Sequence, residues 1–139
     1  MSEMYTERLL DHYRHPRRQG RLALPDLAAE EYNPLCGDRV RIEARLEGGR
    51  IVEVRFDGRG CALCLGAASI LVETIEGRCL DELQGLGQDE FLAELQSPIR
   101  PARLKCALLA WMAFRHAAYG EEEDPQEDPQ EDPKGLGDP

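Results

Sequence analysis

The stretch that most constrains the fold is residues 39–56, where apolar and polar side chains alternate. The apolar members are Val40, Ile42, Ala44, Leu46, Ile51, Val52, Val54 and Phe56. A repeat of two is the spacing of a strand that buries one face. The sequence Glu-Gly-Gly-Arg at 47–50 is typical of a tight turn between two such strands. These residues therefore predict an antiparallel hairpin with one wet face.

Helical patterns dominate the rest of the chain. Apolar side chains repeat every four positions up to His15-Pro16, where the pattern ends, and a loop rich in charge follows. The expected helices span residues 3–15, 62–76, 80–84, 88–96 and 102–119. On the last helix, the heavy apolar stripe consists of Leu104, Leu108, Trp111 and Met112, with Cys106 roughly opposite. A helix, a hairpin and then further helices predict an α+β fold, in which a small antiparallel sheet is packed by helices.

Length and charge set the limits of the domain. A chain of 139 residues without a run of 18 apolar residues predicts one domain and no membrane span. The polar N-terminus lacks the features of a signal peptide, so we expect a cytoplasmic protein. The net charge is −10, but most of it lies in residues 120–139, where "EDPQEDPQEDP" predicts a disordered, solubilising acidic tail. Residues 1–119 are nearly neutral and form the expected folded domain, with no basic excess to indicate nucleic-acid binding.

The five cysteines carry more information than the charge. Their odd number and the expected reducing compartment disfavour a disulfide framework and favour metal or thiol chemistry. Cys36 lies in a turn before a strand, Cys61 begins a helix, and Cys106 lies near the start of the last helix. Helix N-termini stabilise thiolates, which are the form that binds metals and attacks sulfur.

The remaining cysteines and the histidines have simpler interpretations. Cys79 is expected to be a buried filler. Cys64 completes a Cys-x-x-Cys pair with Cys61, and it is either a core residue or half of a thioredoxin-like dithiol. His12, His15 and His116 are expected to be structural or surface residues, the first two as cations suited to a helix C-terminus.

Three motifs and one helix together resemble a known family. "NPLCGD", "GRGCALCLGAAS" and "PARLKCALLAW", in this order, are similar to the cysteine motifs of IscU/SufU/NifU-type iron–sulfur cluster assembly proteins. "LLDHYRHPRRQG" is similar to the family's N-terminal helix and loop. The resemblance implies an IscU/SufE-like α+β fold. It also implies a site made by Cys36, Asp38, Cys61 and a residue pair at the start of the last helix.

The chain differs from IscU proteins in one feature and from SufU proteins in another. Lys105 stands where IscU proteins carry a histidine before the last cysteine, which resembles SufU. SufU proteins, however, carry an insertion before this motif that the present chain lacks. The chain thus combines a SufU-like site with an IscU-like length, and Cys64 matches neither pattern.

The four candidate ligands are Cys36, Asp38, Cys61 and Cys106, a set of three thiolates and one carboxylate. This set suits tetrahedral Zn²⁺, and it also suits a transient iron–sulfur cluster, for which we favour the 2Fe–2S type. The carboxylate is the labile ligand, as a site that hands on its cargo requires. Arg103 and Lys105 are expected to be charge partners of Asp38 or of the thiolates.

Three functional hypotheses follow from these residues. The first is an assembly protein that accepts sulfur on Cys36 from a pyridoxal-phosphate cysteine desulfurase and passes iron–sulfur clusters to recipient apo-proteins or carriers. The second is a zinc-dependent sulfurtransferase that relays persulfide sulfur without building a cluster. The third is a dithiol redox protein that uses Cys61 and Cys64.

Overall fold

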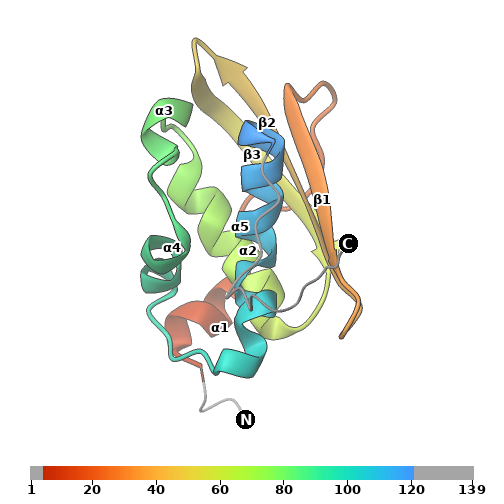
Figure 1. Ribbon diagram of the computed structural model, residues 1–139. Coiled ribbons are helices and arrows are strands. Elements are labelled where there is room, and N and C mark those ends of the chain that lie inside the picture. The colour runs from red at the N-terminus through yellow and green to blue at the C-terminus, as the bar shows by residue number, and fades with distance from the viewer. Residues whose placement is uncertain (1–4, 121–139) are drawn as a thin grey trace, which may run out of the picture.

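The computed structural model describes residues 5–120. One layer is a three-stranded antiparallel sheet in the order β1–β2–β3, and helices cover one of its faces (Figure 1). The strands are β1 (Leu27–Asn33), β2 (Asp38–Glu47) and β3 (Arg50–Arg59). The helices are α1 (Glu7–Arg14), α2 (Ala62–Ile75), α3 (Leu80–Leu83), α4 (Gln88–Leu95), the 3₁₀ turn η2 (Pro101–Arg103) and α5 (Leu104–Tyr119). The predicted α+β fold is confirmed.

The predicted hairpin is formed by β2 and β3. Gly48 and Gly49 make its turn with φ of +60° and +79°, a left-handed conformation that glycine adopts without steric cost. Val40, Ile42 and Ala44 are buried on the inner face, as the alternation predicts. A register shift between Arg45 and Leu46 accommodates one extra residue next to the turn.

Strand β1 was not predicted, because its segment was interpreted as part of a charged loop. Its sequence, Leu-Ala-Ala-Glu-Glu-Tyr-Asn, is poor in β-branched residues, and alanine and glutamate are depleted in strands. Burial alternates along the strand, with Leu27, Ala29 and Glu31 more buried than their neighbours. Backbone pairing with β2 and packing under α5 therefore hold this edge strand in place.

Two helices form the main layer on the sheet. Helix α2 packs against β3 and α1, while α5 packs across β1 and β2 and against α2 (Figure 1). Helix α5 is buried on most of its surface, so the predicted single stripe is too narrow: Leu104 and Met112 are only half-buried, while Cys106 and Ala110 are buried. The difference arises because α5 contacts the sheet on one side and helices on the other.

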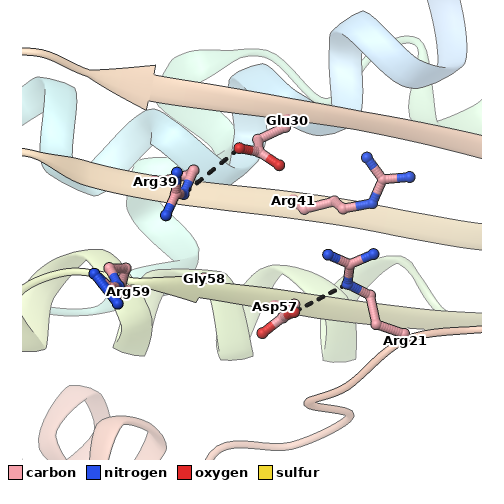
Figure 2. Close-up of a pocket in the computed structure, with 7 residues that line it drawn as sticks. All are labelled: Arg21, Glu30, Arg39, Arg41, Asp57, Gly58 and Arg59. Atoms are coloured by element: carbon pink, nitrogen blue, oxygen red, sulfur yellow. Dashed lines mark hydrogen bonds and ion pairs between the residues drawn. The ribbon is translucent and has the colours of Figure 1, made fainter.

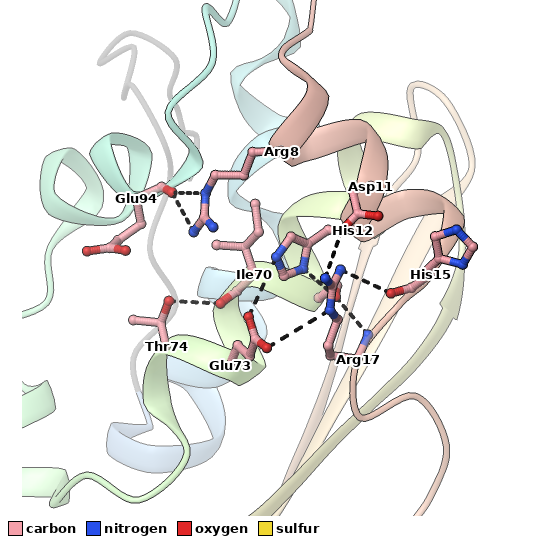
Figure 3. A network of polar contacts seen from close by, with 10 residues as sticks. Arg8, Asp11, His12, His15, Arg17, Ile70, Glu73, Thr74 and Glu94 are labelled. Atoms are coloured by element: carbon pink, nitrogen blue, oxygen red, sulfur yellow. Dashed lines mark hydrogen bonds and ion pairs between the residues drawn. The ribbon is translucent and has the colours of Figure 1, made fainter.

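Helix α1 is attached to α2 by a buried polar network (Figure 3). His12 Nδ1 lies 2.7 Å from Ser69 Oγ, which also accepts the Arg17 backbone N–H at 2.8 Å. On the other side of the ring, His12 Nε2 lies 3.6 Å from Glu73 Oε1. Burial lowers the pKa of His12, so its expected structural role is confirmed, but its interpretation as a cation is wrong.

Three further predictions concern a membrane span, Cys79 and the acidic tail. Within residues 5–120, no helix combines the length and the apolar character needed to span a bilayer. Cys79 is half-buried at the start of α3 rather than fully buried. Apart from Gly120, the predicted acidic tail lies outside the described residues.

Candidate metal centre

The four predicted ligands come together where three junctions meet: the β1–β2 turn, the β3–α2 connection and the start of α5. Ligand atoms of Cys36, Asp38 and Cys106 all lie within 4.8 Å of one another. The Cys36 and Cys106 sulfurs are 3.9 Å apart, and Cys61 Sγ lies 3.7 Å from Asp38 Oδ2. Residues distant in sequence therefore share one polar cluster.

The turn between β1 and β2 presents Cys36 to solvent. Its backbone is held by Asn33, whose carbonyl accepts the N–H of Gly37 at 2.8 Å and of Cys36 at 3.3 Å. The Asn33 side chain accepts the Leu35 N–H at 3.1 Å. Gly37 has φ +79°, a value that favours glycine, and Asp38 then begins β2 as a buried residue. The exposed thiol of Cys36 and the buried carboxylate of Asp38 are thus separated in the sequence by one glycine.

Cys61 is the N-cap of α2, and its sulfur accepts the Cys64 backbone N–H at 3.4 Å. Arg103 Nη2 also donates to this sulfur, at 2.9 Å. A hydrogen bond from Cys106, the Cys64 amide and the Arg103 charge lower the pKa of Cys61 to about 6. The lowered pKa of Cys61 agrees with the thiolate expected at a helix start.

Cys106 behaves differently, although it also lies in the first turn of a helix. It is buried, and its hydrogen bond to the Cys61 sulfur, together with burial, raises its pKa. The hydrogen bond thus favours a thiolate at Cys61 and a protonated thiol at Cys106. The raised pKa of Cys106 differs from the expectation that the start of a helix stabilises a thiolate there.

Of the two predicted charge partners, Arg103 contacts the site. It pairs with the Cys61 sulfur and not with Asp38, because η2 places its guanidinium over the N-terminus of α2. Lys105, two residues further on, is exposed. The sequence indicated that a cation would pair with the site. It did not indicate whether Arg103 or Lys105 would do so, or whether the acceptor would be Asp38 or a thiolate.

Cys64 lies directly behind the site. It is fully buried, and burial raises its pKa. A Cβ atom at Gly60 would lie 3.1 Å from Cys64 Sγ and 3.0 Å from Asp38 Oδ1. Only glycine at this position lets both groups approach the backbone that leads into Cys61.

A separate hollow of about 400 Å³ lies on the open face of the sheet (Figure 2). It is lined by Arg21, Glu30, Arg39, Arg41, Asp57, Gly58 and Arg59. Arg21 pairs with Asp57 at 2.9 Å and Arg39 with Glu30 at 3.5 Å. No thiol lines this hollow, and it was not predicted from the sequence. Its only signal was the run of arginines at alternate positions of β2.

The donor set fits zinc. Two sulfurs on one tetrahedral zinc, each at about 2.3 Å, lie about 3.8 Å apart, close to the 3.9 Å between Cys36 and Cys106. The Cys61–Asp38 separation of 3.7 Å is similar to that of a sulfur and an oxygen on the same ion. Cys36, Asp38 and Cys106 therefore already lie at metal-ligand spacings, and Cys61, which lies outside this trio, contacts it through Asp38.

The protein is a small α+β domain in which thiols and a carboxylate, the groups that bind metals or clusters, gather at one place. The model of the NifU-like N-terminal domain matches residues 4–125, so the chain belongs to that family. The predicted resemblance is thereby confirmed.

Two relatives and one solved structure show how similar the chain is to other members. Zinc-dependent sulfurtransferase SufU of Bacillus subtilis (strain 168) is 30% identical over 139 residues, covering 88% of this chain and 94% of SufU. The iron–sulfur cluster assembly scaffold protein IscU of Escherichia coli (strain K12) is 30% identical over 117 residues, covering 81% of this chain and 90% of IscU. The crystal structure of FiSufU from Fervidobacterium islandicum AW-1 matches with a TM-score of 0.74 at 23% identity, covering 84% of this chain and 97% of that one. This likeness shows the shared fold.

The relatives' names and the cluster support the same class of site. One relative is named for zinc and the other for iron–sulfur clusters, and cysteine thiolates with a carboxylate bind both. The site is therefore one for a metal or a cluster.

Proposed function

We propose that this protein accepts sulfur from a cysteine desulfurase and assembles or passes on an iron–sulfur cluster. Cys36, Asp38, Cys61 and Cys106 hold the metal or the cluster. The observation that carries the proposal is the meeting of these residues, with Cys36, Asp38 and Cys106 within 4.8 Å of one another. A bound zinc would fix the thiolates and keep them from oxidation, and a 2Fe–2S cluster is the favoured cargo.

Cys36 is the proposed sulfur acceptor. It is exposed on a turn, whereas Cys106 is buried and Cys61 is fixed as a helix cap. Moving Cys36 out of the ligand set therefore disturbs the surrounding structure less than moving Cys61 or Cys106 would. Its freed thiolate attacks the persulfide of the desulfurase, and the outer sulfur moves to Cys36 as the desulfurase thiolate leaves.

Arg103 supports this step through Cys61. Its guanidinium, 2.9 Å from the Cys61 sulfur, balances the charge that a site with several thiolates accumulates. We assign it a positioning role, since Cys36 itself receives the sulfur. Recipient apo-proteins or carriers then take the cluster, and the labile ligand Asp38 is where an incoming ligand enters.

The acceptor is tested by mixing the protein with a pyridoxal-phosphate cysteine desulfurase and cysteine, trapping persulfides by alkylation, and mapping them by mass spectrometry. We expect the persulfide on Cys36, and we expect Cys36→Ser to abolish stimulation of the desulfurase. Cys79→Ser is the matched control, because Cys79 lies outside the site. Sulfur found on Cys106 or Cys64 instead, with Cys36→Ser still active, would overturn the assignment.

A second candidate function is sulfur relay at a permanently bound zinc, without a cluster. It is favoured by the likeness to the zinc-dependent sulfurtransferase SufU and by the SufU-like Lys105 before Cys106. Under both candidates we expect about one zinc per chain in the purified protein. Anaerobic reconstitution with iron and sulfide separates them: cluster absorbance supports assembly, and retained zinc without a chromophore supports relay.

A further inference from the structure

Cys64 has no part in the function proposed above, yet its position is unusual. It is the second thiol of a Cys-x-x-Cys pair at the start of α2, and its backbone N–H donates to the first thiol, Cys61, at 3.4 Å. Residues three apart on a helix are neighbours, and this arrangement is the one in which dithiol oxidoreductases form and break a disulfide. Cys61 and Cys64 are therefore placed to react with each other.

The Cys64 sulfur points back toward the helix start. A Cβ atom at the preceding Gly60 would lie 3.1 Å from it, which places the sulfur beside the backbone that leads into Cys61. Because Cys64 is 0% exposed, bulky external thiols and acceptor proteins do not reach it, whereas a sulfur on Cys61 does. Burial behind a more accessible partner is the usual situation of a resolving thiol.

We propose that Cys64 is a resolving thiol, which releases the outer sulfur of a persulfide on Cys61 as sulfide and forms a Cys61–Cys64 disulfide. This inference rests on the proposed function, since the sulfur arrives from the acceptor Cys36. Cys61 first attacks the outer sulfur of the Cys36 persulfide, and Cys36 leaves as a thiolate. Both Cys36 and Cys61 contact Cys106, so the exchange stays within one cluster.

The release step balances in atoms and electrons. Cys64 attacks the inner sulfur of Cys61–S–SH, the bond to the outer sulfur breaks, and the outer sulfur departs as sulfide. The Cys64 proton goes to the departing sulfur, giving H₂S, and Asp38, on the same side of Gly60, is placed to relay it. The outer sulfur gains two electrons and the two thiols lose two. An external dithiol reductant then restores Cys61 and Cys64.

The chemistry matters because clusters contain sulfide, whereas a desulfurase delivers sulfur at the oxidation level of a persulfide. A built-in dithiol supplies the missing electrons at the place where the cluster forms. The step requires Cys61 to be free of metal, so it precedes cluster closure.

The test uses the metal-free full-length protein without added reductant. Wild type, Cys64→Ser and the control Cys79→Ser are loaded with sulfur by desulfurase and cysteine and, in parallel, by inorganic polysulfide, and the donor is removed. Released sulfide is quantified. Mass spectrometry then gives the mass of the tryptic peptide of residues 60–78, which contains Cys61 and Cys64 and no other cysteine.

For wild type and Cys79→Ser we expect one sulfide per disulfide and a peptide lighter by two hydrogens. For Cys64→Ser we expect the peptide to keep an extra sulfur on Cys61 and sulfide release to fall about tenfold or more, because the intramolecular attack is lost. Cys64→Ala, with circular dichroism and zinc content compared with wild type, separates lost chemistry from lost folding.

Equal sulfide release from wild type and Cys64→Ser, or no Cys61–Cys64 disulfide in the loaded wild type, overturns the inference. The proposed function fails separately, if the desulfurase places no persulfide on the chain. In that case the polysulfide arm still decides the role of Cys64.

Discussion

Asp38 is the only carboxylate of the proposed ligand set, and under the proposed function it is the ligand that is displaced when cargo leaves. A carboxylate binds soft metals less tightly than a thiolate, so an incoming ligand displaces it first. We predict that Asp38→Ala loosens zinc and prolongs the lifetime of an assembled cluster severalfold, because the displaceable ligand is gone. Decay of cluster absorbance in the presence of an apo-acceptor measures this. Asp57→Ala, on the open face of the sheet, is the control, and an unchanged lifetime for Asp38→Ala contradicts the labile-ligand argument.

His12 leads to a prediction for how the free energy of unfolding depends on pH. Its pKa in the folded protein lies below the usual value of about 6.5, so below that pH the unfolded chain binds more protons than the folded one. Its contribution to stability is therefore complete above pH about 6.5 and is lost as the pH falls toward the folded pKa. We expect His12→Gln to flatten the dependence of unfolding free energy on pH between 8 and 5. The exposed His15→Gln is the control and should keep the wild-type slope, whereas equal slopes for His12→Gln and wild type would contradict a neutral His12.

The sequence predicted well which residues gather at the site, but it predicted their electrostatics poorly. Cys36, Asp38, Cys61 and Cys106 stand in recognisable motifs, so their grouping could be predicted. The raised pKa of Cys106 could not be predicted, because it depends on burial and on a hydrogen bond to Cys61 at the start of another helix. The hydrogen-bond acceptor of Arg103 could not be predicted for the same reason, because it depends on how η2 is positioned relative to α2.

Among the elements, the β1–β2 turn is the best candidate for contact with a desulfurase. Leu35, next to Cys36, is 85% exposed, so its apolar surface is available to a partner that approaches the thiol. We predict that Leu35→Ser weakens stimulation of the desulfurase severalfold and leaves zinc content unchanged. Leu24→Ser, 81% exposed and away from the turn, is the matched control. Equal losses for both variants would show that Leu35 has no special contact.

The packing of α1 on α2 depends on Gly66. A Cβ atom there would lie 2.9 Å from both Cδ1 and the carbonyl oxygen of Leu9, so alanine forces the helices apart. We expect Gly66→Ala to lower the free energy of unfolding by about 1–3 kcal/mol in urea titrations. Gly85→Ala, whose nearest atom would be 3.8 Å away, should change it by less than about 0.5 kcal/mol. A neutral Gly66→Ala would mean that α1 shifts freely.

Elements with strong periodicity were predicted closely, and the one without it was missed. The β2–β3 hairpin and α2 follow from alternation, Gly48-Gly49 and a continuous apolar run. Strand β1 has alanines and glutamates that favour no strand, and it forms because β2 offers an unpaired edge and α5 covers its inner face. Only tertiary contacts determine such a strand, so single-sequence reasoning has no signal for it.

At the scale of the whole molecule, acidic charge is concentrated at the C-terminal end of the sequence. Residues 121–139 hold a third of the acidic side chains and almost no apolar ones. We predict that deleting them leaves the melting temperature and the zinc content of the protein unchanged, because such a segment adds no core. Thermal unfolding and metal analysis of the shortened and full chains measure this. A fall of many degrees would show that the tail packs on the domain.

The convergence of three junctions on one cluster has a thermodynamic consequence. A metal held by Cys36, Cys61 and Cys106 is also a cross-link among segments far apart in the sequence, and it stabilises the fold by mass action. Cargo release therefore lowers the stability of the turn and of two helix starts at the same moment. Loss of the metal cross-link should therefore appear as faster hydrogen exchange at the amides of these junctions.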